Sequence, residues 1–229
     1  DFDLIIPASN VDSRTFELQN IEDWAVRNNL QLNRKKSQEI VFFRPHTRKA
    51  KIPVIPEVPG VPRVNRIKLL GVVLADNFSM EDHIASVVSS SASALYALKI
   101  LRTHGMDRDC IQKVFQATVI SRLQYASPAW WGYTTETQRE RFESFLRRSV
   151  KAGFYSDKSP DFASICESAD DCFLRSVELK QDHLLRSLLP PPKVETGYDL
   201  RSRKHNYFLP YKINNLFEKN FFIRMFYKD

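Results

Sequence analysis

Lysines and arginines are the residues whose types and spacing could do chemistry in this sequence, because they gather in three short stretches. These are Arg34, Lys35 and Lys36 in one run, Arg139, Arg141, Arg147, Arg148 and Lys151 along one helical face, and Arg201, Arg203 and Lys204 in "RSRKHNYF". Cations that recur on one face can neutralise the phosphates of a nucleic acid. Aromatic residues beside them, as in the third stretch, can stack on bases.

The composition also favours an anionic partner. The chain has 229 residues, a formal net charge of +7 and 43% hydrophobic residues, enough for the core of one or two domains. No continuous apolar run approaches the roughly 18 to 20 residues that span a bilayer. We therefore expect nucleic acid, and no membrane, as the partner.

The cysteines and glycines indicate which kinds of site to exclude. Cys110, Cys166 and Cys172 are odd in number and irregular in spacing, which predicts no disulfide framework and favours a reducing intracellular location, cytoplasm or nucleus. Cys166 and Cys172 with His183 do not match a zinc-binding spacing. With six glycines in the chain, no Gly-rich phosphate loop is present, so a P-loop or dinucleotide fold has no support.

The elements that must position these residues change in character along the chain. The first third predicts strands at the opening "DFDLII", at Glu39–Phe43 and at Arg66–Leu74, and one helix from Asp12 or Ser13 to Asn29. The near-continuous apolar run of Arg66–Leu74 indicates burial on both faces. Prolines in the segment between the last two strands predict a loop or a sheet edge.

From Ser79 onward the pattern is helical. Ser79 and Asp82 predict a capping box. The predicted helices are Ser79 to about His104, Asp107–Tyr125, Thr135–Lys151, Pro160–Ser168, Ala169–Leu189 and Asn214–Tyr227. Trp130, Trp131 and Tyr133 are expected to pack in the core. The fold class is therefore α+β: a small antiparallel sheet with one helix, then a mostly α-helical region.

Eight segments resemble, in order, the C-terminal half of the reverse transcriptases of LINE-type (non-LTR) retrotransposons. They are "DLIIPASN", "NNLQLNRKKS", "IKLLGVVL", "SSSASALYALKILRTHGM", "YASPAWWGYTT", "FLRRSVKAGF", "DLRSRKHN" and "FFIRMFYKD". The resemblance covers nearly the whole chain. It implies the end of a polymerase palm at 1–76, a helical thumb at 77–155, a helical extension at 156–192 and a basic aromatic tail at 193–229.

The resemblance also implies roles for single residues. Asp1 matches the second aspartate of the family's Phe/Tyr-Ala-Asp-Asp hairpin, a ligand of the two Mg²⁺ ions that clamp the attacking and leaving oxygens. Lys36 matches the lysine that neutralises or protonates the leaving pyrophosphate. Leu70, Gly71 and Val72 match the primer grip. The basic face of Thr135–Lys151, with Arg139, Arg147, Arg148 and Lys151, is the expected duplex-binding face.

The implied partners are the RNA template and the RNA–DNA duplex. The missing fingers, most of the palm and an upstream endonuclease would belong to the intact parent, whose Mg²⁺ the fragment is not expected to hold. We therefore expect a C-terminal fragment of an RNA-directed DNA polymerase that is inactive alone. Two alternatives stay open: a non-catalytic nucleic-acid-binding module and a decayed transposon product.

Overall fold

The structure, a computed structural model, describes residues 3–43, 55–193 and 205–228. It contains both helices and short strands and is mostly helical, as an α+β chain. It divides into two compact units. The first comprises residues 1–69 and 74–78, and the second residues 70–73 and 79–229.

In the first unit a helix is followed by a short strand pair. A 3₁₀ turn, η1 (Ala8–Ser13), leads into α1 (Arg14–Arg27), and β1 (Glu39–Ile40) pairs with β2 (Arg63–Val64). Helix α1 confirms the sequence prediction, including its end, because Asn29 has the left-handed φ of 55° that stops a helix. Ala25 is buried on its inner face.

Two strand predictions in this unit are wrong. Residues 3–7 form no strand, and the strand expected at Glu39–Phe43 is only two residues long. The β1–β2 pair is parallel, with Glu39 opposite Arg63, not antiparallel as expected. The cause is non-local, because a strand persists only where a neighbour takes up its hydrogen bonds, and single pairs are marginal. Here the Glu39 carboxylate supports the pair by binding the guanidinium groups of Arg14 and Arg63, each at 2.7 Å.

The stretch Arg66–Leu74 is a hairpin and not the single buried strand that its apolar run predicts. Strands β3 (Arg66–Leu69) and β4 (Val72–Ala75) flank a two-residue turn. Leu70 and Gly71 both have positive φ, 45° and 89°, as a type I′ turn requires. Burial alternates along β3, and Leu70 is 83% exposed. A glycine that follows an apolar run at a tight turn was therefore mistaken for a strand interior.

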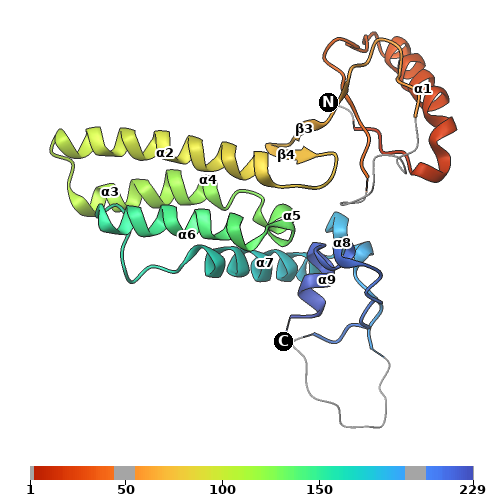
Figure 1. The fold of residues 1–229 in the computed structure, drawn as a ribbon. Coiled ribbons are helices and arrows are strands. Elements are labelled where there is room, and N and C mark those ends of the chain that lie inside the picture. The colour runs from red at the N-terminus through yellow and green to blue at the C-terminus, as the bar shows by residue number, and fades with distance from the viewer. Residues whose placement is uncertain (1–2, 44–54, 194–204, 229) are drawn as a thin grey trace. The chain divides into compact units, whose positions relative to one another are not determined.

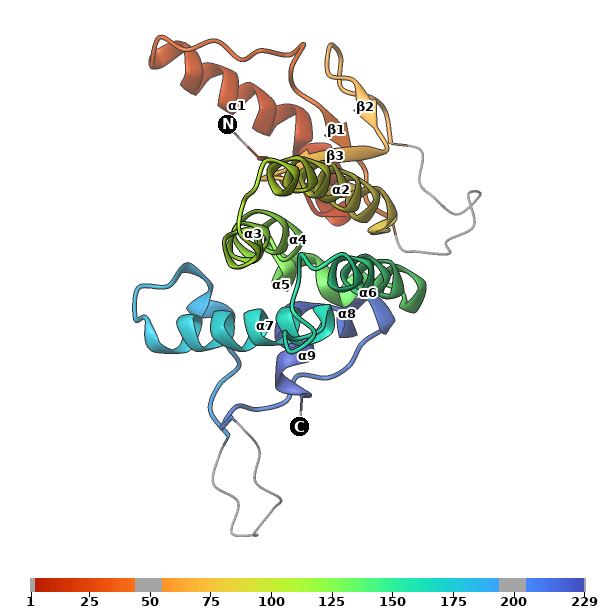
Figure 2. The same cartoon turned by 90° about the vertical axis from the view of Figure 1, so that its left-hand side faces the viewer.

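The second unit is a stack of helices. Its long members are α2 (Glu81–Thr103), α3 (Arg108–Phe115), α6 (Glu136–Lys151) and α7 (Phe162–Leu179). A π-helical turn, η3 (Gln116–Ile120), and α4 (Ser121–Leu123) continue α3, which confirms the helix predicted at Asp107–Tyr125. Figures 1 and 2 show α2, the α3–α4 segment, α6 and α7 in successive layers.

Aromatic rings fill the centre of this stack. Between the layers lie α5 (Ser127–Trp130) and η4 (Trp131–Tyr133). Trp130 stacks on Phe142 at 5.7 Å between ring centroids, and Phe142 stacks on Phe162 at 4.3 Å. All three side chains are fully buried, and Trp131 is nearly so. The expectation that these tryptophans serve packing is confirmed.

The C-terminal elements differ from the prediction in length. One continuous α7 replaces the two helices expected at Pro160–Ser168 and Ala169–Leu189, because the Ser168–Ala169 junction holds no helix breaker. A separate 3₁₀ turn, η5 (Leu184–Leu188), follows. The last predicted helix is two short ones, α8 (Asn215–Glu218) and α9 (Phe221–Phe226), because the Asn220 side chain caps a new start.

Helix α2 also begins later than predicted. Met80, not Ser79, occupies the N-cap position, and the helix starts at Glu81. The Ser79 hydroxyl still accepts a hydrogen bond from the Glu81 N–H at 3.3 Å. The helix ends as expected before Gly105, whose φ is 87°.

Candidate nucleic-acid interface

Helix α6 carries the largest of the three groups of basic residues that the sequence singles out. Its first turn is fixed by a capping box, in which Thr135 accepts from the Gln138 N–H and the Gln138 side chain accepts from the Thr135 N–H. Phe142, Phe145 and Leu146 bury one face. The amphipathic pattern therefore directs the cations between these positions away from the core.

Arg139 is an exception and does not lie on the exposed side that the sequence predicts. Its guanidinium sits over the Trp131 ring, 4.6 Å from the centroid, and its Nε donates to the Thr134 hydroxyl at 2.9 Å. The side chain is half-buried. A cation held on an indole face serves packing, so this arginine belongs to the aromatic core.

Arg147 and Arg148 are exposed and differ in their partners. Arg147 pairs with Glu140 and donates to the Ser144 hydroxyl at 2.8 Å. The hydrogen bond from Arg147 holds the pKa of the Glu140 carboxyl below its usual range. Arg148 uses its Nε on the Ser144 carbonyl oxygen at 3.2 Å and forms no ion pair within the described residues. Exposed pairs are weak, so Arg147 can exchange its carboxylate for another anion.

Arg141 has a structural role between two helices. It pairs with Glu81 at the start of α2, and the Gln138 amide donates to the same carboxylate at 3.0 Å. The Gln138 hydrogen bond is the main reason that the pKa of Glu81 lies below its ordinary value. These contacts join α6 to α2.

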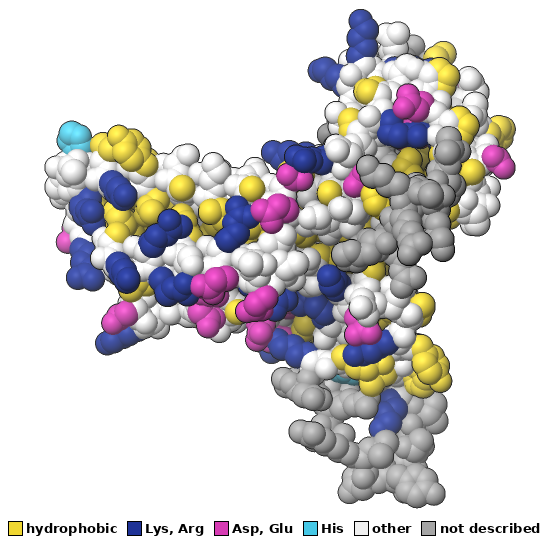
Figure 3. All heavy atoms as spheres, in the orientation of Figure 1, with side chains coloured by type: hydrophobic (Ala, Val, Ile, Leu, Met, Phe, Trp, Pro, Cys, Tyr) yellow, Lys and Arg dark blue, Asp and Glu magenta, His cyan; other side chains and the backbone are white. Residues whose placement is uncertain are grey.

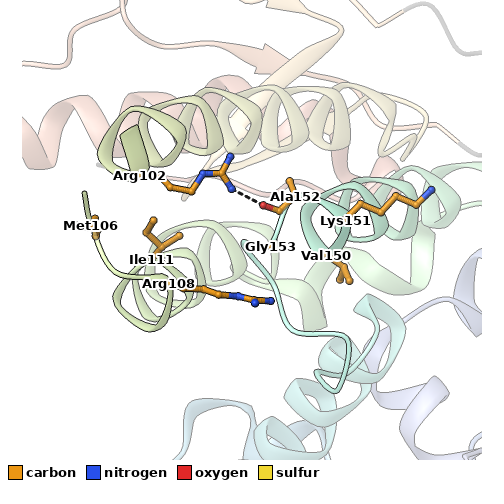
Figure 4. A pocket seen from close by; sticks show the side chains of 8 residues that line it. All are labelled: Arg102, Met106, Arg108, Ile111, Val150, Lys151, Ala152 and Gly153. Carbon is orange, nitrogen blue, oxygen red and sulfur yellow. Dashed lines mark hydrogen bonds between the residues drawn. The ribbon is translucent and has the colours of Figure 1, made fainter. Parts of the chain in front are cut away.

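Two arginines that the sequence did not single out lie beside Lys151. Arg102 is in the last turn of α2, Arg108 is the first residue of α3, and Lys151 is the last residue of α6. Together they line a pocket of about 420 Å³ (Figure 4). Figure 3 shows lysine and arginine side chains gathered over this end of the helical unit.

The feature of the sequence that could have identified Arg102 and Arg108 is their position at the ends of two predicted helices. Two helices joined by a short turn bring the end of one beside the start of the next. Both arginines flank the Gly105 turn, and the α6 end folds over the same turn: the Arg102 guanidinium donates to the Ala152 carbonyl oxygen at 2.6 Å. A pattern along a single helix face cannot reveal a cluster that three helix ends make.

The predicted catalytic positions, Asp1 and Lys36, lie apart from this basic end in sequence. Lys36 is exposed in a turn after α1, where its backbone N–H donates to the Asn33 side chain at 3.2 Å. Asp1 lies outside the described residues, as do Arg201, Arg203 and Lys204. Within residues 3–43, 55–193 and 205–228, no group of three or more His, Cys, Asp or Glu side chains could hold a metal ion.

The predicted primer-grip residues form the tip of the β3–β4 hairpin. Leu70 and Gly71 make its turn, and Val72 is buried. The Tyr125 hydroxyl donates to the Leu70 carbonyl oxygen at 3.2 Å, and a Cβ on Gly71 would stand 3.0 Å from the Tyr125 ring. The glycine is thus required both by its positive φ and by the tyrosine against it.

Two further features concern the cysteines and helix α2. Cys110, Cys166 and Cys172 are all free thiols. Helix α2, contrary to the expectation from its interrupted apolar run, is long and apolar enough by length and composition to cross a membrane. The reason is that serines and alanines interrupt the apolar residues without adding charge. The same helix packs against α3, α4 and α6, and one helix of this kind is weak support for a membrane span.

No family model, no curated protein and no solved structure matches this chain. The function must therefore be argued from its own residues.

Proposed function

We propose that this chain is the C-terminal part of a LINE-type reverse transcriptase and that its helical unit binds the template–primer duplex through phosphates. One observation carries the binding: cations from three helix ends and from the outer face of α6 meet at one end of the unit. Arg102, Arg108, Arg148 and Lys151 are exposed there, and none of them forms an ion pair within the described part of the chain.

Such a basic surface suits binding to the phosphate backbone of a nucleic acid more than recognition of its base sequence. Each Lys or Arg that neutralises a phosphate releases condensed counterions, so affinity falls as salt rises, and no base is recognised. The eight ordered resemblances give the kind of nucleic acid, an RNA template and the RNA–DNA duplex. A thumb holds such a duplex by shape and phosphates.

No catalytic step is assigned to the described residues. The resemblance gives Asp1 to the Mg²⁺ pair and Lys36 to the leaving pyrophosphate, but two metal ions need carboxylates from more than one strand. The described residues supply no such group. They therefore do not fit the magnesium pair by themselves, and the function proposed for this chain is duplex binding.

A salt titration of RNA–DNA duplex binding tests the proposal. The wild-type affinity should fall linearly on a log–log plot, by about 0.7 to 0.9 per phosphate neutralised. Arg147→Gln with Arg148→Gln should weaken all duplex sequences alike and reduce the slope by roughly one to two units. Arg175→Gln removes one exposed arginine of α7 and serves as the control for loss of a positive charge away from the basic end, with an unchanged slope.

Two results would contradict the proposal. Absence of duplex binding at low salt would remove it entirely. Equal salt slopes for the double variant and for Arg175→Gln would mean that the net charge of +7 attracts the duplex without a defined contact at Arg147 and Arg148. A double-stranded DNA competitor separates the alternatives: binding equal to that of RNA–DNA would favour a general nucleic-acid-binding module over a polymerase thumb.

A further inference from the structure

The pocket at the basic end combines a charged rim with an apolar floor. Its volume is about 420 Å³, within the usual range for ligand sites. Ile111 is 1% exposed and lies at its base beside the partly buried Val150 and Met106. Arg102, Arg108 and Lys151 supply the charge, and the eight lining residues include no acidic side chain.

Arg102 is fixed in place before any ligand arrives. One nitrogen of its guanidinium donates to the Ala152 carbonyl oxygen at 2.6 Å, and the group lies over the Phe154 ring, 4.5 Å from its centroid. Phe154 is fully buried. A planar guanidinium has five N–H donors, so Arg102 keeps donors for a second acceptor while its own position costs little entropy.

The other two cations, Arg108 and Lys151, are not held by a hydrogen bond or ion pair within the described residues. Figure 4 shows Arg102 and Arg108 on opposite sides of the Ala152–Gly153 segment, while the Lys151 ammonium extends away from them. Lys151 has a flexible four-carbon stem, which allows it to turn toward an anion. A Cβ built on Gly153 would meet nothing within 4 Å, so the space beside the segment is open.

The acidic residues nearest in sequence lie outside the lining of the pocket. Asp107 and Asp109 flank Arg108, but the Asp107 carboxylate accepts the Asp109 N–H at 2.9 Å as the N-cap of α3. Neither lines the pocket. Up to three positive charges around one hollow call for a ligand with more than one anionic oxygen, and guanidinium forks match phosphate geometry.

We propose that this pocket binds one phosphate group of a bound nucleic-acid strand. The phosphate oxygens meet the guanidinium groups of Arg102 and Arg108, Lys151 closes on the remaining oxygen, and the attached sugar lies on Ile111 and Val150. The inference rests on the proposed function for the source of the phosphate. The binding of a phosphate group between the two guanidinium groups does not depend on the proposed function.

Binding of inorganic phosphate to the full chain tests the chemistry. Phosphate should shift the backbone NMR resonances of Gly153 and Arg108 in a saturable way, and Arg108→Gln should weaken that binding by about fivefold or more. Arg108 is exposed, and its side chain makes no hydrogen bond or ion pair within the described residues, so the variant should fold. Arg175→Gln is the matched control and should bind phosphate as the wild type does. Saturable shifts that are equal in Arg108→Gln and wild type, or no shifts at all, would overturn the site.

Duplex binding tests the source. Arg108→Gln should reduce the salt slope for RNA–DNA duplex by about 0.7 to 0.9, the value for one phosphate. If the wild type binds phosphate in the pocket but Arg108→Gln leaves the salt slope for the duplex unchanged, the pocket takes free phosphate and not a phosphate of the duplex, which contradicts the proposal. If the pocket resonances do not respond while the wild type still binds duplex in a salt-dependent way, the site fails and the proposed function stands. If the wild type binds no duplex, the proposed function fails.

Discussion

At the scale of single residues, a buried ion pair holds the C-terminal segment against α7. Asp170 on α7 is 1% exposed and accepts from Arg224 on α9 at 2.7 Å. Gly132 lies against the same segment, since a Cβ there would stand 2.2 Å from the Lys219 carbonyl oxygen. The two contacts together leave little freedom in how α8 and α9 dock.

Asp170→Asn should therefore be strongly destabilising. It leaves the Arg224 guanidinium without its counter-charge in a mostly buried place, a loss of about 3 kcal/mol in the free energy of unfolding. Asp171→Asn is the matched control, because Asp171 pairs with Lys228 but its side chain is 55% exposed, and its loss should be below about 1 kcal/mol. Urea unfolding curves measure both. Similar losses in the two variants would show that the buried pair is not what anchors α9.

His83 gives a prediction about pH. It is 2% exposed, its Nδ1 accepts the Val73 N–H at 3.3 Å, and its ring meets the edge of Trp130 at 5.2 Å. Burial lowers the pKa of His83. The folded chain therefore holds it neutral, while the unfolded chain takes up a proton near its ordinary pKa of about 6.5.

The sign follows from proton uptake on unfolding. Stability contributed by neutral His83 is complete above pH 6.5 or so and is lost as the pH falls below that value. The free energy of unfolding should thus decrease between pH 7.5 and 5.5, and this decrease should be smaller in His83→Leu than in wild type. His104→Leu changes an exposed histidine and should keep the wild-type dependence. A His83→Leu profile that runs parallel to the wild type would exclude His83 as the titrating group.

At the scale of elements, the start of α6 shows how local chemistry sets a boundary. The capping box of Thr135 and Gln138 satisfies donors that the first turn leaves without intrahelical partners. Thr135→Ala should cost about 1 kcal/mol. Thr118→Ala changes an exposed threonine whose hydroxyl donates to the Val114 carbonyl oxygen at 2.7 Å, away from the box, and it should change stability by less than about 0.5 kcal/mol. Thermal unfolding separates the two, and equal shifts would refute the role of the cap.

The same locality explains which elements the sequence could predict. Helices α1, α2, α3 and α6 were predicted nearly to their ends, because caps, left-handed stops such as Asn29 and Gly105, and the 3.6-residue period all lie within the segment. Strands were not, because the partner of β1 is β2, more than twenty residues away and parallel to it. Strand length depends on partners that the local pattern does not contain.

Side-chain roles divide along the same line. The exposure of Arg147 and Arg148 followed from helical period, but the stacking of Arg139 on Trp131 required knowing that η4 turns back onto α6. Likewise Arg102, Arg108 and Lys151 come from three helix ends, which only the tertiary fold brings to one pocket. A basic face on one helix can be predicted from the sequence, whereas a basic cluster that several elements form together cannot.

At the scale of the whole molecule, the second unit holds the main aromatic core, since Trp130, Phe142 and Phe162 all belong to it. It also includes Leu70–Val73, whose contacts to Tyr125 and His83 are internal to the unit. Its helices from α2 to α6 follow one another closely in the chain, and mostly local contacts favour folding without the rest of the chain. Leu70–Val73 should therefore count as part of this folding unit even though they precede its first helix, α2.

A chain of residues 66–229 should accordingly fold alone, with a helical circular dichroism spectrum and one cooperative urea transition. A chain of residues 79–229 should also be helical but should unfold at lower urea, because it loses the Val73–His83 and Leu70–Tyr125 hydrogen bonds and exposes the His83 ring. A typical intramolecular hydrogen bond contributes about 0.5 to 1.5 kcal/mol, so the loss of two should make a difference of about 1 to 3 kcal/mol. Tyr125→Phe in the longer chain provides the control, since it removes only the bond to Leu70 and should account for part of that difference.

A longer chain that stays unfolded would contradict the independence of the helical unit, and equal midpoints for the two chains would place the hairpin outside it.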